Sequence, residues 1–346
     1  MNNLPASFFP RALLLLSIIF VYASCAAAKS AEATEYLMGT RVFIRVAPCG
    51  RDAQADIQEI IQEIRRFDAA ASAHRENSFP ARLARDGEAN FTNEEEKSIL
   101  LPMLREAFAF ARASGGAFDP FIGKLSKLWG FSSLAMRAEP PRADEIAQAL
   151  AASGHQKLLR LDEDGMAVAR HTELDLGAIA KGEMLDRAAA RLYAWGYRRA
   201  LLNFGGDVYV IGDRIDAEGE PWRIAVQHPR KAQAYLGVAR IQDGAMATSA
   251  DDERFFIHEG KRWHHILNPF TGLPASEAVS ASVIGPRAAL ADALATALFV
   301  LGADRGLALL AQYPGYHALF VFMSNDILQE RMSPGFADAA GWKAAE

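Results

Sequence analysis

Two stretches of the sequence combine residue types and spacings that suit chemistry on a diphosphate. In the apolar run 291–298, Asp292 and Thr296 are four residues apart, so a helix would place a carboxylate beside a hydroxyl on one face. Hard cations such as Mg²⁺ prefer oxygen ligands of this kind. In the stretch 175–182, small residues and a single lysine, Lys181, stand where a strand should turn into a helix, which favours phosphate binding. Together the two stretches predict a magnesium ion and a diphosphate.

Each stretch also has a purely structural interpretation. Asp292 could cap a helix or pair within the core, because an unpaired buried carboxylate is costly. A metal ion compensates that cost better, since it also shares its charge with substrate phosphates. The second stretch could be an ordinary strand-to-helix junction, with Lys181 in solvent and Asp186 on the outer face of the helix. Gly177 and Gly182 favour the functional interpretation, because glycine lets the backbone approach a ligand closely.

A histidine and a glycine pair are weaker candidates. His265 stands where a predicted strand meets a loop that two prolines stiffen and Gly272 loosens. A single strand histidine is more often a packing residue, so its neighbours must decide its role. The segment 203–207, Asn-Phe-Gly-Gly-Asp, predicts a turn between two strands, and that turn alone explains both glycines.

Several common kinds of site find no support in the sequence. The Gly-x-Gly-x-x-Gly pattern of a dinucleotide fold, the Cys and His spacing of a zinc site and the Gly-x-Ser-x-Gly elbow of a serine esterase are all absent. The net charge of -5 and the lack of a Lys/Arg block give no electrostatic support for a nucleic-acid partner. With 346 residues, 51% of them hydrophobic, the chain can bury a large core in one large domain or two ordinary ones.

Residues 1–28 have the layout of a secretory signal peptide, with Arg11 before an apolar run over 12–23 and small residues after it. The run is shorter than the roughly 20 residues of a membrane span. The four residues that end at Cys25 resemble a lipoprotein box with Tyr in place of the usual Leu, so cleavage before Cys25 and lipidation there are slightly favoured. Ordinary cleavage within 26–28 is the alternative. A lipid anchor is the only membrane contact expected.

Hydrophobic spacing predicts an interleaved series of helices and strands. Helices are expected at 57–67, from a capping box of Thr92 and Glu95 to an end at Gly115 and Gly116, near 146–150, around 291–298 and at 307–313. Strands are expected at 41–46, in a hairpin over 158–168, at 200–204, 208–211, 223–226 and 236–241, in a hairpin over 255–266, at 283–284 and at 317–322. This mixed order predicts an α+β fold, a single large domain of antiparallel strands and helices, rather than a doubly wound parallel sheet.

Seven motifs in order closely resemble the ApbE family of FAD:protein FMN transferases. They lie at 36–40, 117–120, 175–182, 205–207, 247–249, 265–274 and 292–296. Seven ordered motifs are far more specific than any one of them. The resemblance implies a flavin transferase domain over residues 35–335 with an ApbE-like, T-fold-related architecture.

The same resemblance implies an activity: magnesium-dependent transfer of FMN from FAD to a Thr or Ser hydroxyl of an acceptor protein, with release of AMP. It implies FAD as the substrate, Mg²⁺ as the cofactor and a subunit of a membrane redox complex as the acceptor. The expected location is the periplasm, where the lipidated form would be anchored to the inner membrane. Two other functions stay open: a periplasmic FAD pyrophosphatase that yields FMN and AMP, and a non-catalytic flavin-binding protein.

The resemblance also implies roles for individual residues. The metal ligands would be the side chains of Asp292 and Thr296 and the carbonyls of Ala178 and Ala295. Contacts to FAD are implied for Met38, Ala117, Phe118, Asp119, Asp175, Lys181 and Ile266. His265 matches the family's loop histidine and would activate or position the acceptor hydroxyl, since a neutral imidazole can take a proton near pH 7, while Lys181 supports the diphosphate charge. His74 stands where an aromatic residue stacks on the flavin, so the stacking contact is expected to be weaker here.

Overall fold

The structure is a computed structural model that describes residues 30–131 and 137–345. The expected signal peptide over residues 1–28, including Cys25, lies outside the described residues. The helices are α1 (Ala53–Ala71), α2 (Phe79–Asp86), α3 (Glu94–Ala113), α4 (Gly123–Trp129), α5 (Ala143–Ala151), α6 (Ala180–Ala194), α7 (Ala288–Leu310) and α8 (Phe336–Ala339).

The strands alternate with these helices along the chain. They are β1 (Ala31–Leu37), β2 (Thr40–Val46), β3 (Glu88–Asn90), β4 (Leu158–Leu161), β5 (Gly165–Val168), β6 (Ala200–Phe204), β7 (Asp207–Ile211), β8 (Trp222–Gln227), β9 (Tyr235–Ile241), β10 (Gly244–Ala250), β11 (Phe255–His258), β12 (Lys261–His264), β13 (Ser280–Gly285), β14 (His317–Ser324), β15 (Ile327–Met332) and β16 (Lys343–Ala344).

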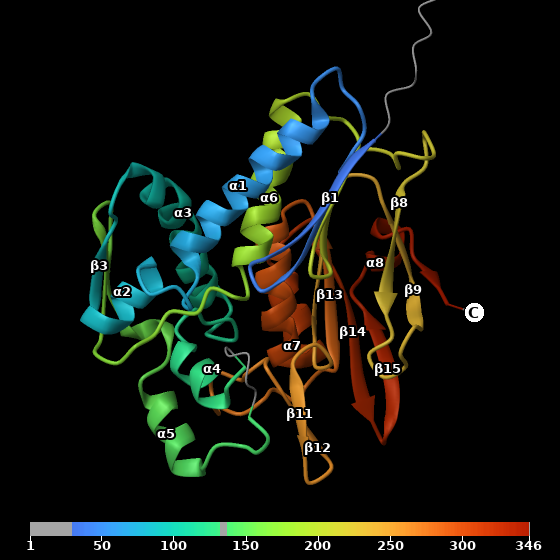
Figure 1. Cartoon of the computed structure of the whole chain (residues 1–346). Coiled ribbons are helices and arrows are strands. Elements are labelled where there is room, and N and C mark those ends of the chain that lie inside the picture. Colours follow the sequence, from blue (N-terminus) through green and yellow to red (C-terminus); the bar gives the residue numbers. More distant parts are fainter. Residues whose placement is uncertain (1–29, 132–136, 346) are drawn as a thin grey trace, which may run out of the picture.

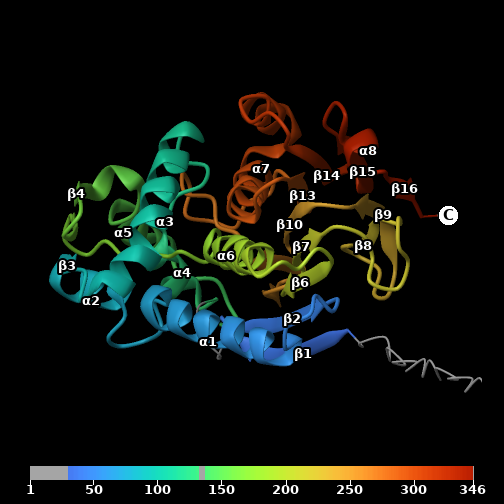
Figure 2. The same ribbon diagram turned by 90° about the horizontal axis from the view of Figure 1, so that it is seen from above.

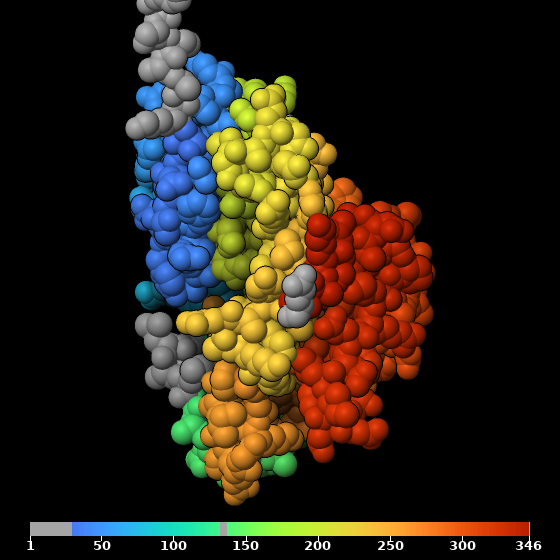
Figure 3. All heavy atoms as spheres, turned by 90° about the vertical axis from the view of Figure 1, so that its right-hand side faces the viewer, coloured from blue at the N-terminus to red at the C-terminus, as the bar shows by residue number. Residues whose placement is uncertain are grey.

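The central element is an eight-stranded sheet in the order β1-β2-β6-β7-β10-β13-β14-β15, and every neighbouring pair in it is antiparallel. Helices α1, α6 and α7 lie on one side of the sheet, and the small sheet β16-β9-β8 lies with α8 on the other (Figures 1 and 2). Figure 3 shows the second side, with the yellow strands β8 and β9 beside the red C-terminal elements. The predicted α+β fold is confirmed.

Both faces of the central sheet are buried, and the side chains alternate between two cores as the period of a strand requires. On β14, Ala318 and Phe320 join the core under the helices, whereas Leu319 and Val321 join the core under the small sheet. A strand buried on both faces appears in the sequence as a continuous apolar run, which explains why this late strand was predictable.

Helix α7 is the core helix of the fold. It is long and apolar enough to cross a membrane by length and composition, but most of that stretch is buried inside the protein. A helix that is apolar on every side must be enclosed in this way. Its course changes at Gly302, whose φ of 72° is not helical. Of the helix expected at 307–313, residues 307–310 form the last part of α7, and residues 311–313 lie beyond its end.

The local structure differs from the prediction at several places, including β1 and the start of α3. Strand β1 was missed because its Ala- and Glu-rich sequence lacks a strong apolar alternation; it pairs with β2 through a tight turn at Met38 and Gly39, whose φ angles of 52° and 71° suit a hairpin. The capping box of Thr92 and Glu95 was wrong by one residue.

The true cap of α3 is Asn93, whose side chain accepts the backbone N–H of Glu96 at 2.8 Å. The carboxylate of Glu96 accepts the backbone N–H of Thr92 at 2.7 Å. Asparagine is a better N-cap than threonine, which explains the shift.

Candidate functional site

The N-terminal ends of α6 and α7 bring Lys181 and Asp292 together, although 111 residues separate them. The Lys181 ammonium lies 3.2 Å from Asp292 Oδ2 and 3.3 Å from Oδ1, and the backbone N–H of Gly182 donates to Asp292 Oδ2 at 3.2 Å. A Cβ at Gly182 would lie 2.3 Å from the carbonyl oxygen of Ala288. The glycine therefore permits the close helix contact on which this ion pair depends.

A second carboxylate, that of Asp207, shares the same lysine. Asp207 Oδ2 lies 3.0 Å from the Lys181 ammonium, and Oδ1 accepts the backbone N–H of Thr248 at 3.1 Å. The side chains of Asp207 and Asp292 are only 5% and 6% exposed. The predicted turn before Asp207 is present, but its aspartate was not singled out as a site residue. The available signal was its place at the end of the 205–207 motif.

Burial and mutual electrostatics change the proton affinities of this cluster. Burial raises the pKa of Asp292 to about 6, against the opposing effect of Lys181. The pKa of Lys181 is raised above its usual value although burial would lower it, because Asp207 and Asp292 stabilise the ammonium form. With all three groups ionised, the cluster carries one excess negative charge and attracts a cation.

Hydroxyl groups extend the cluster along α7 and the central sheet. Thr296 lies one turn beyond Asp292, and its Oγ1 is 3.1 Å from Ser249 Oγ on β10. The Thr248 and Ser282 hydroxyls are 2.8 Å apart on neighbouring strands. The helix face predicted from the spacing of Asp292 and Thr296 thus meets further oxygen atoms from the sheet.

The turn before α6 approaches the same lysine from the other side. The Lys181 ammonium donates to the carbonyl oxygen of Gly177 at 3.4 Å, so the turn that contains Ala178 lies beside the cluster. Ala295 lies inside α7, where a carbonyl already accepts a helical hydrogen bond and has only its second lone pair to offer. Of the two carbonyls predicted as metal ligands, Ala178 is the better placed.

These residues fit a hard divalent cation. Within residues 30–131 and 137–345, no group of three or more His, Cys, Asp or Glu is arranged to hold a metal ion, but the predicted set needs only one carboxylate. Apart from its ion pair with Lys181, the buried Asp207 Oδ2 accepts no hydrogen bond from any described residue. Magnesium binds through one or two carboxylates and keeps several waters, so the oxygen donors and the excess negative charge suit it.

Among the predicted FAD contacts, Asp119 is occupied by internal hydrogen bonds. Its Oδ1 accepts the backbone N–H of Phe121 at 2.9 Å, and its Oδ2 accepts the backbone N–H of His155 at 2.6 Å and lies 2.8 Å from His155 Nδ1. The preceding Ala117 and Phe118 are buried. A ligand would therefore meet the backbone of this loop rather than the carboxylate.

The loop around Asp119 is tied to the turn before α6. The backbone N–H of Asp175 donates to the carbonyl oxygen of Pro120 at 2.7 Å, and Asp175 Oδ1 accepts the backbone N–H of Gly177 at 2.9 Å. Asp175 thus shapes the turn that leads to Lys181. Met38 lies at the tip of the β1–β2 hairpin.

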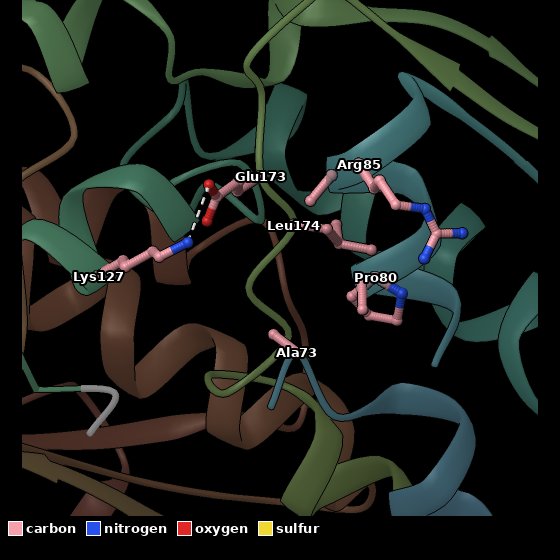
Figure 4. A pocket seen from close by; sticks show the side chains of 8 residues that line it. Ala73, Pro80, Arg85, Lys127, Glu173 and Leu174 are labelled. Carbon is pink, nitrogen blue, oxygen red and sulfur yellow. Dashed lines mark ion pairs between the residues drawn. The ribbon is translucent and has the colours of Figure 1, made fainter. Parts of the chain in front are cut away.

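His74 is exposed just after the end of α1, and its neighbour Ala73 lines a surface hollow of about 300 Å³ (Figure 4). The hollow lies between α2, α4 and the segment 173–174, and Lys127 pairs with Glu173 at its edge at 3.7 Å. None of the residues that line it belongs to the Lys181 cluster, so we assign it no chemical role.

His265 lies directly after β12, and its backbone N–H donates to the carbonyl oxygen of Arg254 at 3.0 Å. Its Nδ1 is buried and has no hydrogen-bond partner among the described residues. Burial, together with smaller effects of the charges at His264, Arg254 and Lys181, lowers the pKa of His265 to about 3. The imidazole is therefore neutral at pH 7 and lies within electrostatic range of Lys181. Ile266 beside it is buried, and its carbonyl accepts the N–H of Ala275 at 2.9 Å, which folds the loop back.

Known proteins resemble this chain in sequence and in fold. The ApbE family model matches residues 38–320. An FAD:protein FMN transferase of Treponema pallidum is 35% identical over 328 residues, which cover 88% of this chain and 87% of that protein. The ApbE protein of Thermotoga maritima has a TM-score of 0.79 at 31% identity, and the flavin transferase ApbE of Vibrio cholerae has 0.79 at 27%; each match covers 90% of this chain and 99% of the other. The chain therefore belongs to the ApbE family.

Proposed function

We propose that this protein is an FAD:protein FMN transferase that uses Mg²⁺, modifies a Thr or Ser hydroxyl of an acceptor protein and releases AMP. Relatives that carry this enzyme name match it over most of both chains. The observation that carries the proposal is the cluster at the N-terminal ends of α6 and α7, where Lys181 lies between Asp207 and Asp292.

The transfer exchanges one phosphorus–oxygen bond for another. The acceptor oxygen attacks the phosphorus of the FMN half of FAD and forms the new bond. The bond from that phosphorus to the bridging oxygen breaks, and AMP leaves with the bridging oxygen. The hydroxyl proton passes to solvent or to a nearby base. Negative charge builds on the phosphate oxygens during the transfer, and this charge must be stabilised.

The residues of this chain can supply that stabilisation. The ammonium of Lys181, at the N-terminal end of α6, presents positive charge to a diphosphate. Bound Mg²⁺, held by Asp292, Thr296 and the Ala178 carbonyl, would neutralise diphosphate oxygens. Because its pKa is about 3, His265 is a weak base. We therefore propose that His265 accepts a hydrogen bond from the acceptor hydroxyl and orients that hydroxyl, and does not take up its proton.

The site of action is also part of the proposal. The leader over residues 1–28 supports export to the periplasm, and lipidation of Cys25 would hold the enzyme at the inner membrane. An enzyme held by such an anchor would be within reach of an acceptor subunit of a membrane redox complex. Cell fractionation, followed by mass measurement of the mature N-terminus, tests both points.

The decisive experiment incubates the protein with FAD, Mg²⁺ and a periplasmic redox subunit, and then measures the intact mass of that subunit. A mass gain of one FMN less one water, lost when the protein is Asp292→Ala, supports transfer. A matched control is Asp304→Ala, whose carboxylate is 91% exposed. Free FMN and AMP without modified subunit would indicate a pyrophosphatase instead, and unchanged FAD would indicate a carrier.

A further inference from the structure

Asp186 of α6 caps the N-terminus of α7. Its Oδ1 accepts the backbone N–H of Ala288 at 2.7 Å, and its Oδ2 accepts that of Ala289 at 3.0 Å. The first amides of a helix have no acceptor within the helix, so they need partners from elsewhere. Residue Arg287 at the N-cap of α7 makes no side-chain cap of its own. The cap therefore comes from another helix.

Asp292 of α7 in turn caps the N-terminus of α6. Gly182 is the third residue of α6, and its backbone N–H donates to Asp292 Oδ2 at 3.2 Å. Helix α6 also lacks a side-chain cap from its own N-cap residue, Ile179. Each helix thus gives a carboxylate to the first turn of the other. This reciprocal capping fixes the two helices where Gly182 permits their close contact.

Arg287 extends this arrangement to a third helix. Its guanidinium lies 3.5 Å from Asp186 Oδ2 and pairs in a bidentate manner with Glu106 of α3, at 2.7 Å and 2.8 Å. The Asp186 side chain is only 16% exposed. The first turn of α7 is consequently held by α6 through Asp186 and by α3 through Arg287.

We propose that Asp186 is a positioning residue for the cation site, acting through the first turn of α7. Asp292 begins the next turn of that helix, so a frayed first turn would let Asp292 and Thr296 rotate away from Lys181. Lys181 would then pair with Asp207 alone, and the oxygen donors would no longer converge. The proposal rests on the proposed function for its link to Mg²⁺, whereas the coupling of the two helix ends stands on the contacts alone.

The test compares Asp186→Ala with Asn93→Ala in the full mature protein. Asn93 is a matched control, because it caps α3 and contacts none of the cluster residues. Calorimetric titration with Mg²⁺ alone should show about tenfold weaker binding for Asp186→Ala, as is typical when a residue that orients metal ligands is removed. Asn93→Ala should lose thermal stability without a change in Mg²⁺ affinity. Equal affinity in Asp186→Ala and wild type, or an equal loss in both variants, would overturn the proposal.

A second measurement is independent of the metal. In metal-free protein, hydrogen exchange of Asp186→Ala should rise in the first turn of α7 and, across the contact, at Gly182 of α6. Unchanged exchange at Gly182 would overturn the coupling. Asp186→Asn keeps one acceptor oxygen and should give an intermediate effect, which keeps the test open should the Ala variant fail to fold. If wild type neither binds Mg²⁺ nor transfers FMN, the proposed function fails, and the exchange data alone decide the coupling.

Discussion

Asp207 Oδ2 lies 3.0 Å from the Lys181 ammonium, so a single lysine is flanked by two buried carboxylates, the other being that of Asp292. Such a cluster is unbalanced in charge, and its stability depends on what cations it holds.

Replacing Lys181 with Met should therefore destabilise the metal-free protein, because the two carboxylates then face each other without a cation. The expected loss is on the order of 2 kcal/mol in the free energy of unfolding, less than the roughly 3–5 kcal/mol of a fully buried broken pair. The discount reflects the 27% exposure of the lysine side chain. Urea denaturation in the presence of a chelator measures the loss, and stability equal to wild type would contradict the charge assignment.

Replacing Asp292 with Asn should have a pH-dependent effect. Burial raises the pKa of Asp292 from 3.8 to about 6, so the folded protein favours the protonated carboxyl. The contribution of this group to the free energy of unfolding is therefore complete below pH 3.8 and is lost as the pH rises through about 6. The stability of Asp292→Asn relative to metal-free wild type should therefore improve between pH 4 and pH 7. Thermal denaturation across this range measures it; a constant difference would show that the carboxylate is not desolvated. Added Mg²⁺ should stabilise wild type and not this variant.

Replacing Gly182 with Ala should push α6 away from α7. The added Cβ would lie 2.3 Å from a backbone oxygen of Ala288, and a backbone atom cannot move aside cheaply. We expect a loss above about 2 kcal/mol, the upper part of the range for overpacking, and no Mg²⁺-dependent stabilisation. The control is Ala190→Gly on the exposed side of the same helix, which should cost about 1 kcal/mol through helix propensity and leave Mg²⁺ binding unchanged.

Replacing His265 with Ala should leave FAD binding nearly intact while FMN transfer falls steeply, since the imidazole is assigned to the acceptor hydroxyl. The matched control is His258→Ala on the adjacent hairpin, which should transfer normally. Because the pKa of His265 is about 3, the wild-type rate between pH 5 and pH 8 should show no titration of this residue. An inflection near pH 6.5 that disappears in His265→Ala would refute the orienting role and favour a proton-accepting one.

Much of the fold follows from patterns within single elements. Apolar runs and turn residues predicted several strands closely, because alternation and turn chemistry are local properties. These strands are β6, β7, β8, β9 and the β11–β12 hairpin, whereas β10 between them was not among the expected strands. Strand β1 was missed since its pairing with β2, not its own composition, makes it a strand. The cap of α3 was misplaced by one residue because adjacent Thr and Asn both suit a helix start.

Some features of the candidate site likewise follow from the local sequence, whereas others depend on tertiary packing. The four-residue spacing of Asp292 and Thr296 and the small residues around Lys181 are local features, and they are the basis on which oxygen donors and a phosphate-binding turn were predicted. Only tertiary packing brings Lys181 to Asp292, adds Asp207 from the sheet and makes Asp186 a cap of α7. The lowered pKa of His265 likewise depends on burial. Spacing along a helix is set by bonds within one segment, whereas desolvation and ion pairing require segments far apart in the chain to meet.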